Sequence, residues 1–174
     1  MWCKLFVGDV ILVIGAVYRP PRSPIDFLTQ LDDHLSELTN DRSRIILTGD
    51  FNISDVNWDA RIAGPADRMH ADTMLEIMAK HSLIQVVNGP TRIQGQCQTT
   101  LDLLFLSDET FGYEVDIKDG ISDHKVVVAR LRIKHKINKV KTPTVNVMIS
   151  KMPMTYQYWI TLNWLLTECP KKMM

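Results

Sequence analysis

A short apolar run that ends in a Gly-Asp-Phe-Asn tetrapeptide constrains the fold of this chain most strongly. Residues 44–48 read Arg-Ile-Ile-Leu-Thr, and the tetrapeptide follows directly at residues 49–52. A β-branched run bounded by turn residues predicts a buried strand. Asp50 and Asn52 are two residues apart, so on an extended chain their side chains point the same way and can act on one group. Turn formation by Asp and Asn explains the same four residues equally well when they are taken alone.

The rest of the sequence alternates apolar runs with helical patterns, which is typical of an α/β fold. The first two strands are predicted at Trp2–Phe6 and Val10–Tyr18, joined by a tight hairpin at Gly8-Asp9. Further strands are predicted at Ile45–Thr48, Leu101–Leu106, Tyr113–Ile117 and Lys125–Ile133. Helices are predicted from Ser23, the expected cap before Pro24, to about Asn40, and over Asp67–His81.

The composition changes after Lys134, where a Lys-rich segment gives way to sequence without a clear period. We therefore predict one domain over residues 1–136 and a tail of uncertain order over residues 137–174. Within this tail, Tyr156–Leu166 has the composition either of a short apolar helix or of a poorly ordered segment.

The overall composition excludes several classes of protein. Twenty basic and twenty acidic residues leave no net charge, so a general attraction to nucleic acid cannot be derived from the total. Cys3, Cys97 and Cys169 are far apart and form no Cys-x-x-Cys pair, which argues against a zinc site or a disulfide framework and favours a reducing, intracellular compartment. The apolar run at residues 10–17 is much shorter than the roughly 20 residues of a membrane helix, so no membrane association is expected.

Two further segments carry groups that suit chemistry on a phosphate. Asp102 lies inside the apolar run at residues 101–106, where a buried carboxylate needs a partner. His124, preceded by Asp123, lies just before the last predicted strand, and its imidazole can fill that role while its other nitrogen addresses a substrate. Alternatively, Asp102 caps a strand or pairs with an arginine, Arg92 or Arg130.

Five segments in this order resemble the endonuclease/exonuclease/phosphatase superfamily, and most closely the apurinic-like endonuclease of non-LTR retrotransposons. The residues that carry the resemblance are Tyr18-Arg19-Pro20-Pro21, Gly49-Asp50-Phe51-Asn52, Pro90-Thr91-Arg92, Thr100–Phe105 and Ile121-Ser122-Asp123-His124. The resemblance implies a two-sheet α/β sandwich with helices outside. It also implies an endonuclease that nicks DNA with Mg²⁺, or with Mn²⁺ in its place, so that a reverse transcriptase can prime on the freed 3′ hydroxyl in the nucleus.

The resemblance also implies roles for individual residues. Asp50 would orient or deprotonate the attacking water, and Asn52 would help to hold that water and the phosphate. His124 would contact the scissile phosphate, Asp102 would orient His124, and Tyr18 would stabilise charge on phosphorus. Asp123 would lie at the metal or its water shell. The DNA backbone would be contacted by Arg19, Thr91 and Arg92.

The family pattern begins earlier than this sequence, with an Asn on a first strand and a Glu that is the main metal ligand. Neither precedes Tyr18 here, so we expect residues 1–136 to be the C-terminal part of such a domain. A second hypothesis follows, in which the chain is a truncated retrotransposon remnant without catalytic activity. A third keeps the superfamily but takes a phosphoinositide or sphingolipid as substrate, and the Tyr-Arg-Pro-Pro and Pro-Thr-Arg segments favour DNA over it.

Overall fold

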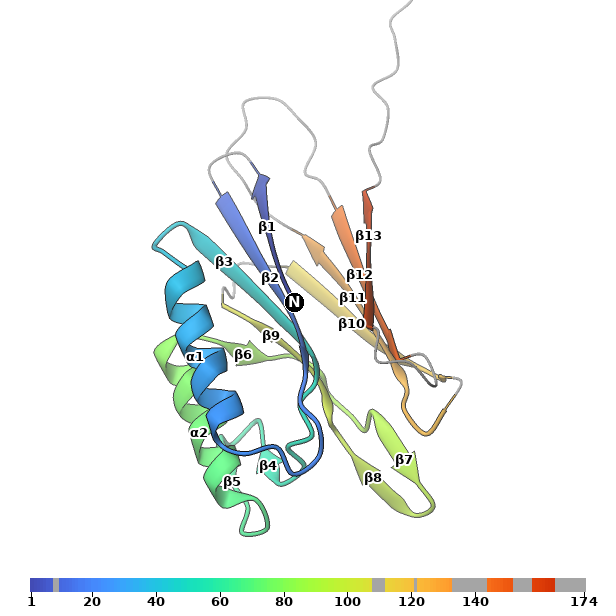
Figure 1. The fold of residues 1–174 in the computed structure, drawn as a ribbon. Coiled ribbons are helices and arrows are strands. Elements are labelled where there is room, and N and C mark those ends of the chain that lie inside the picture. The colour runs from blue at the N-terminus through green and yellow to red at the C-terminus, as the bar shows by residue number, and fades with distance from the viewer. Residues whose placement is uncertain (8–9, 108–111, 121, 133–143, 152–157, 165–174) are drawn as a thin grey trace, which may run out of the picture.

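The structure, a computed structural model, describes residues 1–7, 10–107, 112–120, 122–132, 144–151 and 158–164. Figure 1 shows the order of the elements, which combine strands with two helices. Their bounds are β1 Trp2–Val7, β2 Val10–Tyr18, α1 Asp26–Leu38, β3 Ser43–Asp50, β4 Val56–Asn57, β5 Ile62–Ala63, α2 Arg68–Lys80, β6 Ile84–Gln85, β7 Arg92–Gln94, β8 Cys97–Thr99, β9 Asp102–Leu106, β10 Gly112–Lys118, β11 Val126–Arg132, β12 Thr144–Lys151 and β13 Tyr158–Trp164.

Two sheets make up the body of the molecule. The first has the strand order β1-β2-β3-β9-β6, in which β2 and β3 are parallel and the other neighbours are antiparallel. The second has the order β10-β11-β12-β13 and is antiparallel throughout. Two short hairpins, β4 with β5 and β7 with β8, project from one end of the sheets (Figure 1).

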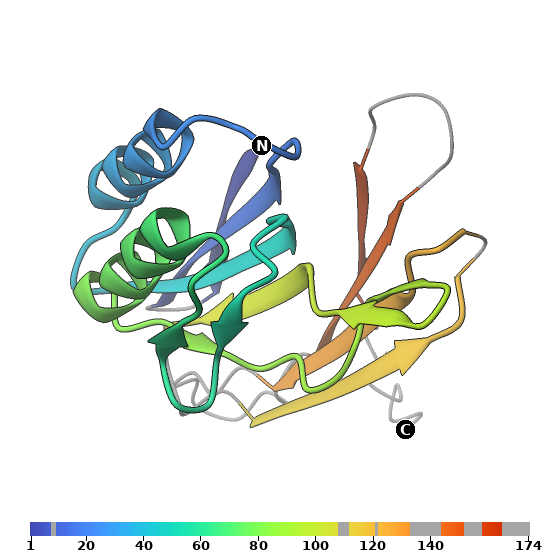
Figure 2. The same ribbon diagram turned by 90° about the horizontal axis from the view of Figure 1, so that it is seen from below.

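Helices α1 and α2 cover one face of the first sheet, and the second sheet lies on its other face (Figure 2). Both faces of β3 are therefore covered, and its last six residues are all buried. A strand covered on both sides reads as a continuous apolar run rather than as an alternation, which is why residues 45–47 carry three large aliphatic side chains in a row. The predicted α/β class and two-sheet sandwich are confirmed.

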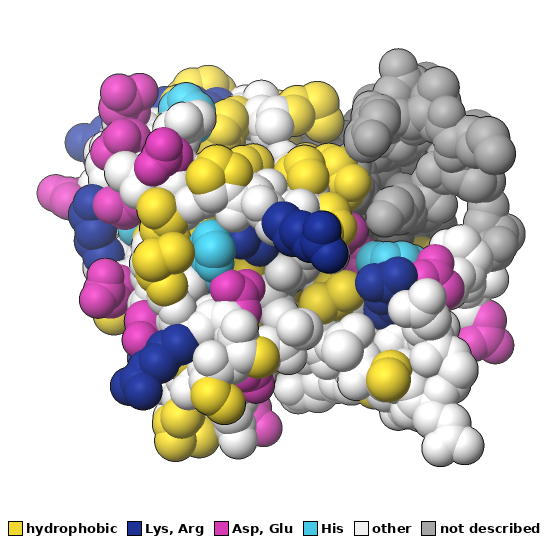
Figure 3. Space-filling model, turned by 60° about the horizontal axis from the view of Figure 1, so that its bottom comes forward, with side chains coloured by type: hydrophobic (Ala, Val, Ile, Leu, Met, Phe, Trp, Pro, Cys, Tyr) yellow, Lys and Arg dark blue, Asp and Glu magenta, His cyan; other side chains and the backbone are white. Residues whose placement is uncertain are grey.

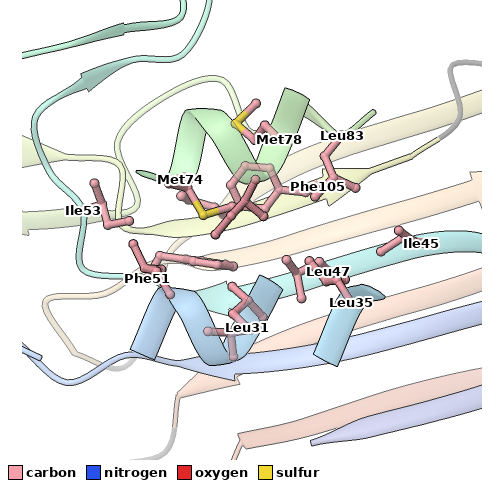
Figure 4. Packing of buried hydrophobic residues seen from close by; sticks show 14 of the residues in the cluster. Leu31, Leu35, Ile45, Leu47, Phe51, Ile53, Met74, Met78, Leu83 and Phe105 are labelled. Atoms are coloured by element: carbon pink, nitrogen blue, oxygen red, sulfur yellow. The ribbon is translucent and has the colours of Figure 1, made fainter. Parts of the chain in front are cut away.

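Two hydrophobic clusters hold these layers together. Between the sheets, Leu12, Ile14 and Ile46 pack with Val127 and Leu131 of β11. Between the first sheet and its helices, the buried side chains are Leu28, Leu31, Leu35, Leu47, Met74, Ile77, Met78, Leu103 and Phe105, part of the set drawn in Figure 4. The rings of Phe51 and Phe105 meet edge to face with centroids 5.1 Å apart.

Most predicted elements are present, and the start of the first helix is the clearest error. The N-cap of α1 is Ile25 rather than Ser23, and no side chain caps the helix. The Ser23 hydroxyl instead donates to the carbonyl oxygen of Pro20 (2.7 Å), because the chain makes a turn there before the helix begins. Helix α2 agrees with its prediction to within one residue at each end. Neither described helix is long and apolar enough to span a membrane.

The structure adds information about both ends of the sequence. Val7 pairs with Val10, so β1 and β2 are antiparallel neighbours as predicted, while Gly8 and Asp9 lie outside the described residues. The described part of the Tyr156–Leu166 segment is a strand, Tyr158–Trp164, so the suggested helix is wrong. β12 and β13 continue the sheet of β10 and β11 by antiparallel pairing. The domain boundary near residue 136 falls within residues 133–143, outside the described part, and stays a prediction.

Candidate active site

Three polar side chains form one row across the ends of β2, β3 and β9. Tyr18 lies opposite Asp50 in the parallel pair, and Asp50 lies opposite Asp102 in the antiparallel pair. Residues directly opposite one another point to the same face of a sheet. By alternation with Ile46 and Leu104, that face is the one that packs against the second sheet. The row therefore lies at one end of the inter-sheet core.

A glycine permits the approach of the strands just before Asp50. Gly49 has a φ of +140°, and a Cβ on it would lie 1.8 Å from the carbonyl oxygen of Val17. Only glycine adopts this conformation without strain and leaves room for that carbonyl. Asp50, the last residue of β3, is 1% exposed. The Gly-Asp pair thus belongs to the buried strand and not to the turn that follows it.

Asn52 differs from its predicted position. Its φ is +49°, so the chain leaves the extended conformation there and the side chains of Asp50 and Asn52 do not run parallel. The backbone N–H of Asn52 donates to Oδ1 of Asp50 (3.2 Å), and its side-chain amide donates to the carbonyl oxygen of Arg19 (2.8 Å). The expectation of two parallel side chains on an extended strand is wrong, because a left-handed residue turns the chain back toward the end of β2.

Asp102 and His124 form the contact expected of them. Nδ1 of His124 lies 2.8 Å from Oδ2 of Asp102, and both residues are buried. An ionised carboxylate accepts from Nδ1–H, which fixes the imidazole ring and leaves Nε2 as the nitrogen that can address a substrate. The alternative partners of Asp102 are engaged elsewhere, Arg92 with Asp123 and Arg130 with Glu114.

Asp50, Asp102 and His124 together form a group of the size that can hold a metal ion. Each offers a ligand atom, these atoms all lie within 4.8 Å of one another, and all three residues are buried. A carboxylate has two oxygens, so Asp102 can accept from His124 with one and offer the other. The two carboxylates suit a hard divalent cation, which prefers oxygen ligands.

Asp123, the residue predicted to lie at the metal, is not a member of this group. Its Oδ2 accepts from Nε of Arg92 at 2.8 Å. The hydrogen bond from Arg92 lowers the pKa of Asp123, and it outweighs the opposing effect of partial burial. The backbone bridge between Arg92 and His124 holds this ion pair beside the imidazole. Arg92, a third exposed on its side chain, remains placed to meet a ligand from solvent.

Thr91 lies in the interior, although it was predicted to contact DNA. It is 0% exposed, and its hydroxyl accepts from the backbone N–H groups of Leu101 (3.0 Å) and Asp102 (2.9 Å). Its carbonyl oxygen accepts from the N–H of Lys125, the residue after His124 (2.6 Å). Thr91 therefore joins the segment that carries Asp102 to the segment that carries His124. Nothing in the local sequence signals this, because each partner is distant along the chain.

Arg19 is also buried, at 1% exposed, and so is not placed to contact DNA. Its guanidinium donates to the carbonyl oxygens of Phe51 (3.3 Å), Asn52 (3.1 Å) and Ser23 (3.2 Å). Desolvation by burial lowers the pKa of Arg19, and the negative charge of Asp67 partly opposes this shift. The guanidinium therefore hydrogen-bonds to the turn that follows β3.

The surface next to the group of Asp50, Asp102 and His124 is hollowed. A pocket of about 230 Å³ is lined by Asn52 and Arg92 together with Ser54, Gln94, Cys97, Thr99 and Leu101. Figure 3 shows the end of the molecule from which the hairpins project, where basic and histidine side chains lie close to acidic ones. Arg92 both lines this hollow and pairs with Asp123, and Asn52, which also lines it, bonds to Asp50, so the hollow lies beside the buried group.

A model of the endonuclease-reverse transcriptase family matches residues 12–128. The chain belongs to this family. The matched segment contains Tyr18, Asp50, Asp102 and His124. No curated protein that was compared with the chain matches it.

Membership of the endonuclease-reverse transcriptase family confirms the resemblance seen in the sequence. It supports a nuclease function within a retrotransposon, with nucleic acid as substrate and a reverse transcriptase as associate. Endonucleases of this superfamily generally use divalent metals, and the buried Asp-Asp-His group is of a size and chemistry to hold one.

Proposed function

We propose that this chain is a metal-dependent endonuclease that nicks DNA, so that a reverse transcriptase can extend the freed 3′ hydroxyl. The observation that carries the proposal is the buried group of Asp50, Asp102 and His124, whose ligand atoms lie within 4.8 Å of one another inside the matched segment. Such an enzyme acts where chromosomal DNA is, so an intracellular and nuclear location is part of the same proposal.

His124 is the group proposed to meet the scissile phosphate. Asp102 holds the imidazole through Nδ1, so Nε2 is the nitrogen that faces the substrate. A positioned donor at a phosphate oxygen stabilises the negative charge that develops there during in-line attack. Asp102 acts through His124, which makes it a positioning residue as well as a carboxylate of the buried group.

Asp50 is the proposed base for the attacking water. It is buried beside Asp102, and one of its oxygens accepts from the backbone of Asn52, which fixes the direction of the carboxylate. Asn52 and the half-buried Tyr18 lie next to Asp50 on either side. We assign Asn52 to holding the water and phosphate and Tyr18 to donating to a phosphate oxygen.

The proposed metal is Mg²⁺, with Mn²⁺ as an alternative, held by the carboxylates of Asp50 and Asp102. A bound divalent cation would stabilise charge on phosphate oxygens and lower the pKa of a water molecule. Asp123 accepts from Arg92 with Oδ2, so Oδ1 is the oxygen that it would offer to the metal or its water shell.

A second candidate, a chain that binds nucleic acid without cutting it, is favoured by one observation. Two of the carboxylates expected near the phosphate have internal partners, since Asp102 accepts from His124 and Asp123 accepts from Arg92. Such pairing leaves each of these two carboxylates a single oxygen for a metal. The two candidates predict opposite results in a cleavage assay.

The test is nicking of supercoiled plasmid by the purified chain with Mg²⁺, with Mn²⁺ and with a chelator. Asp50→Asn removes the buried carboxylate, and Asp119→Asn is the matched control because its side chain is 98% exposed. The proposal expects metal-dependent nicking that Asp50→Asn abolishes and Asp119→Asn retains. A folded sample that leaves the plasmid intact with Mg²⁺ and also with Mn²⁺ supports the second candidate.

A further inference from the structure

Arg19 holds the turn that follows Asp50 and carries Asn52, and its burial leaves it no contact with a substrate. We infer that Arg19 is a further positioning residue of this site, which sets the geometry of Asp50 and Asn52 through hydrogen bonds to the end of β3 and to the turn, and does not bind DNA. The inference rests on the proposed function and goes beyond it, since it names the group that keeps the site assembled.

The backbone of Arg19 makes the first two contacts. Its N–H donates to the carbonyl oxygen of Asp50 (2.8 Å), which continues the pairing of β2 with β3 by one step. Its carbonyl oxygen accepts from the side-chain amide of Asn52 (2.8 Å). The backbone of Arg19 therefore bonds to both Asp50 and Asn52.

The guanidinium makes the remaining contacts. Nη1 donates to the carbonyl oxygens of Phe51 (3.3 Å) and Asn52 (3.1 Å), and Nη2 donates to that of Ser23 (3.2 Å). Its planar fork spans carbonyls of two separate loops, which a lysine ammonium cannot do at once. Among the described residues, Nε has no hydrogen-bond partner.

Burial decides between a structural and a substrate-binding use of this charge. Arg19 is 1% exposed, whereas its neighbour Arg22 in the same loop is exposed. A side chain that contacts a DNA phosphate must reach the surface. Burial of a guanidinium is unfavourable unless its donors find acceptors, and here backbone carbonyls accept from both terminal nitrogens, Nη1 and Nη2.

The turn needs such support because of its backbone conformation. Asn52 has a φ of +49°, a conformation that an L-residue adopts at a cost and keeps only when surrounding contacts impose it. The N–H of the same residue fixes Oδ1 of Asp50. Loss of the Arg19 contacts would let this N–H move, and with it the carboxylate of Asp50.

The test compares Arg19→Lys and Arg19→Gln, with Arg22→Gln as the matched control. Nicking is measured over a range of DNA and salt concentrations to separate kcat from KM. We expect kcat to fall about 10- to 100-fold in both Arg19 variants, because small displacements of reacting groups have effects of that order. KM and its salt dependence should stay at the wild-type values.

A DNA-binding role would give a different pattern and overturn the inference. A phosphate contact would raise KM in Arg19→Gln, lower the slope of log affinity against log salt by about 1, and leave Arg19→Lys close to wild type. Arg22→Gln shows how large such an effect is for an exposed arginine of the same loop.

Amide hydrogen exchange keeps the inference separate from the proposed function. If the wild type does not nick DNA, the nuclease proposal fails. Faster exchange at the Asn52 amide in Arg19→Lys than in the wild type would still support the inference that Arg19 holds the turn. Unchanged exchange there would overturn it. If neither Arg19 variant folds, exchange at the Asn52 amide of the wild type is the test. An Asn52 N–H without protection would contradict the bond to Asp50 on which the inference depends, and would overturn it.

Discussion

Replacing Asp102 by Asn tests whether the Asp102–His124 pair acts as a unit. The bond from Nδ1 of His124 to Oδ2 of Asp102 is 2.8 Å long and lies in a buried environment, so water does not replace it. Hydrogen bonds to a charged group contribute about 1.5–3 kcal/mol. If that amount supports His124 only in the transition state, the rate of nicking at saturating DNA and metal falls about 10- to 150-fold.

The assay is single-turnover nicking of supercoiled plasmid by wild type, Asp102→Asn, His124→Gln and the double variant. Because Asp102 is proposed to act through His124, the double variant should be no slower than His124→Gln alone. A titration with Mg²⁺ accompanies each protein, since a variant that lacks a metal ligand needs more metal for half-maximal rate. Two independent, multiplying effects, or an Asp102→Asn rate within about 3-fold of wild type, would refute the reasoning.

Three further predictions concern stability. Thr91→Val should lower the free energy of unfolding by about 1–3 kcal/mol in urea titrations, because the N–H of Asp102 loses its buried acceptor, and Thr91→Ser should keep it. Gly49→Ala should fail to fold, or should lower the urea midpoint by more than any variant above, because its Cβ would meet the carbonyl of Val17. Burial raises the pKa of Asp32, but hydrogen bonds from a lysine and a histidine at the end of α2 outweigh this and lower it. The stabilisation is therefore present above the unfolded-state value of about 3.9 and lost as pH falls below it, so the stability difference between wild type and Asp32→Asn should shrink at acid pH.

The sequence predicts best where one local pattern decides the structure. β2 has the predicted bounds because its β-branched run is limited by turn residues, and α2 follows its apolar period. The strands β6, β7 and β8 have two or three residues each, too few for any period to show, and were not predicted. The capping prediction at Ser23 failed because a serine hydroxyl can serve a preceding turn as well as a helix.

The site residues also fall into those that a rule applied to the sequence predicts and those that it does not. The partnership of Asp102 and His124 follows from a general rule, since a carboxylate in an apolar strand needs a partner. The positions of Arg19 and Thr91 do not follow from any local rule, because both look like surface residues of a basic or polar segment. Apart from the nearby carbonyl of Ser23, their hydrogen-bond partners are distant along the chain, 33 residues away for Arg19 with Asn52 and 11 for Thr91 with Asp102, and only the folded structure brings them together.

The location of Asp102 and His124 on different layers has a consequence for how activity arises during folding. Asp102 begins β9 of the first sheet, whereas His124 lies two residues before the strand β11 of the second. Neither sheet holds the pair by itself. A nascent chain whose first sheet has already closed around α1 and α2 would still lack the imidazole, so the Asp102–His124 pair could not form until β11 had been synthesised and had docked. The docking of the two sheets would therefore be the step that completes the proposed active site.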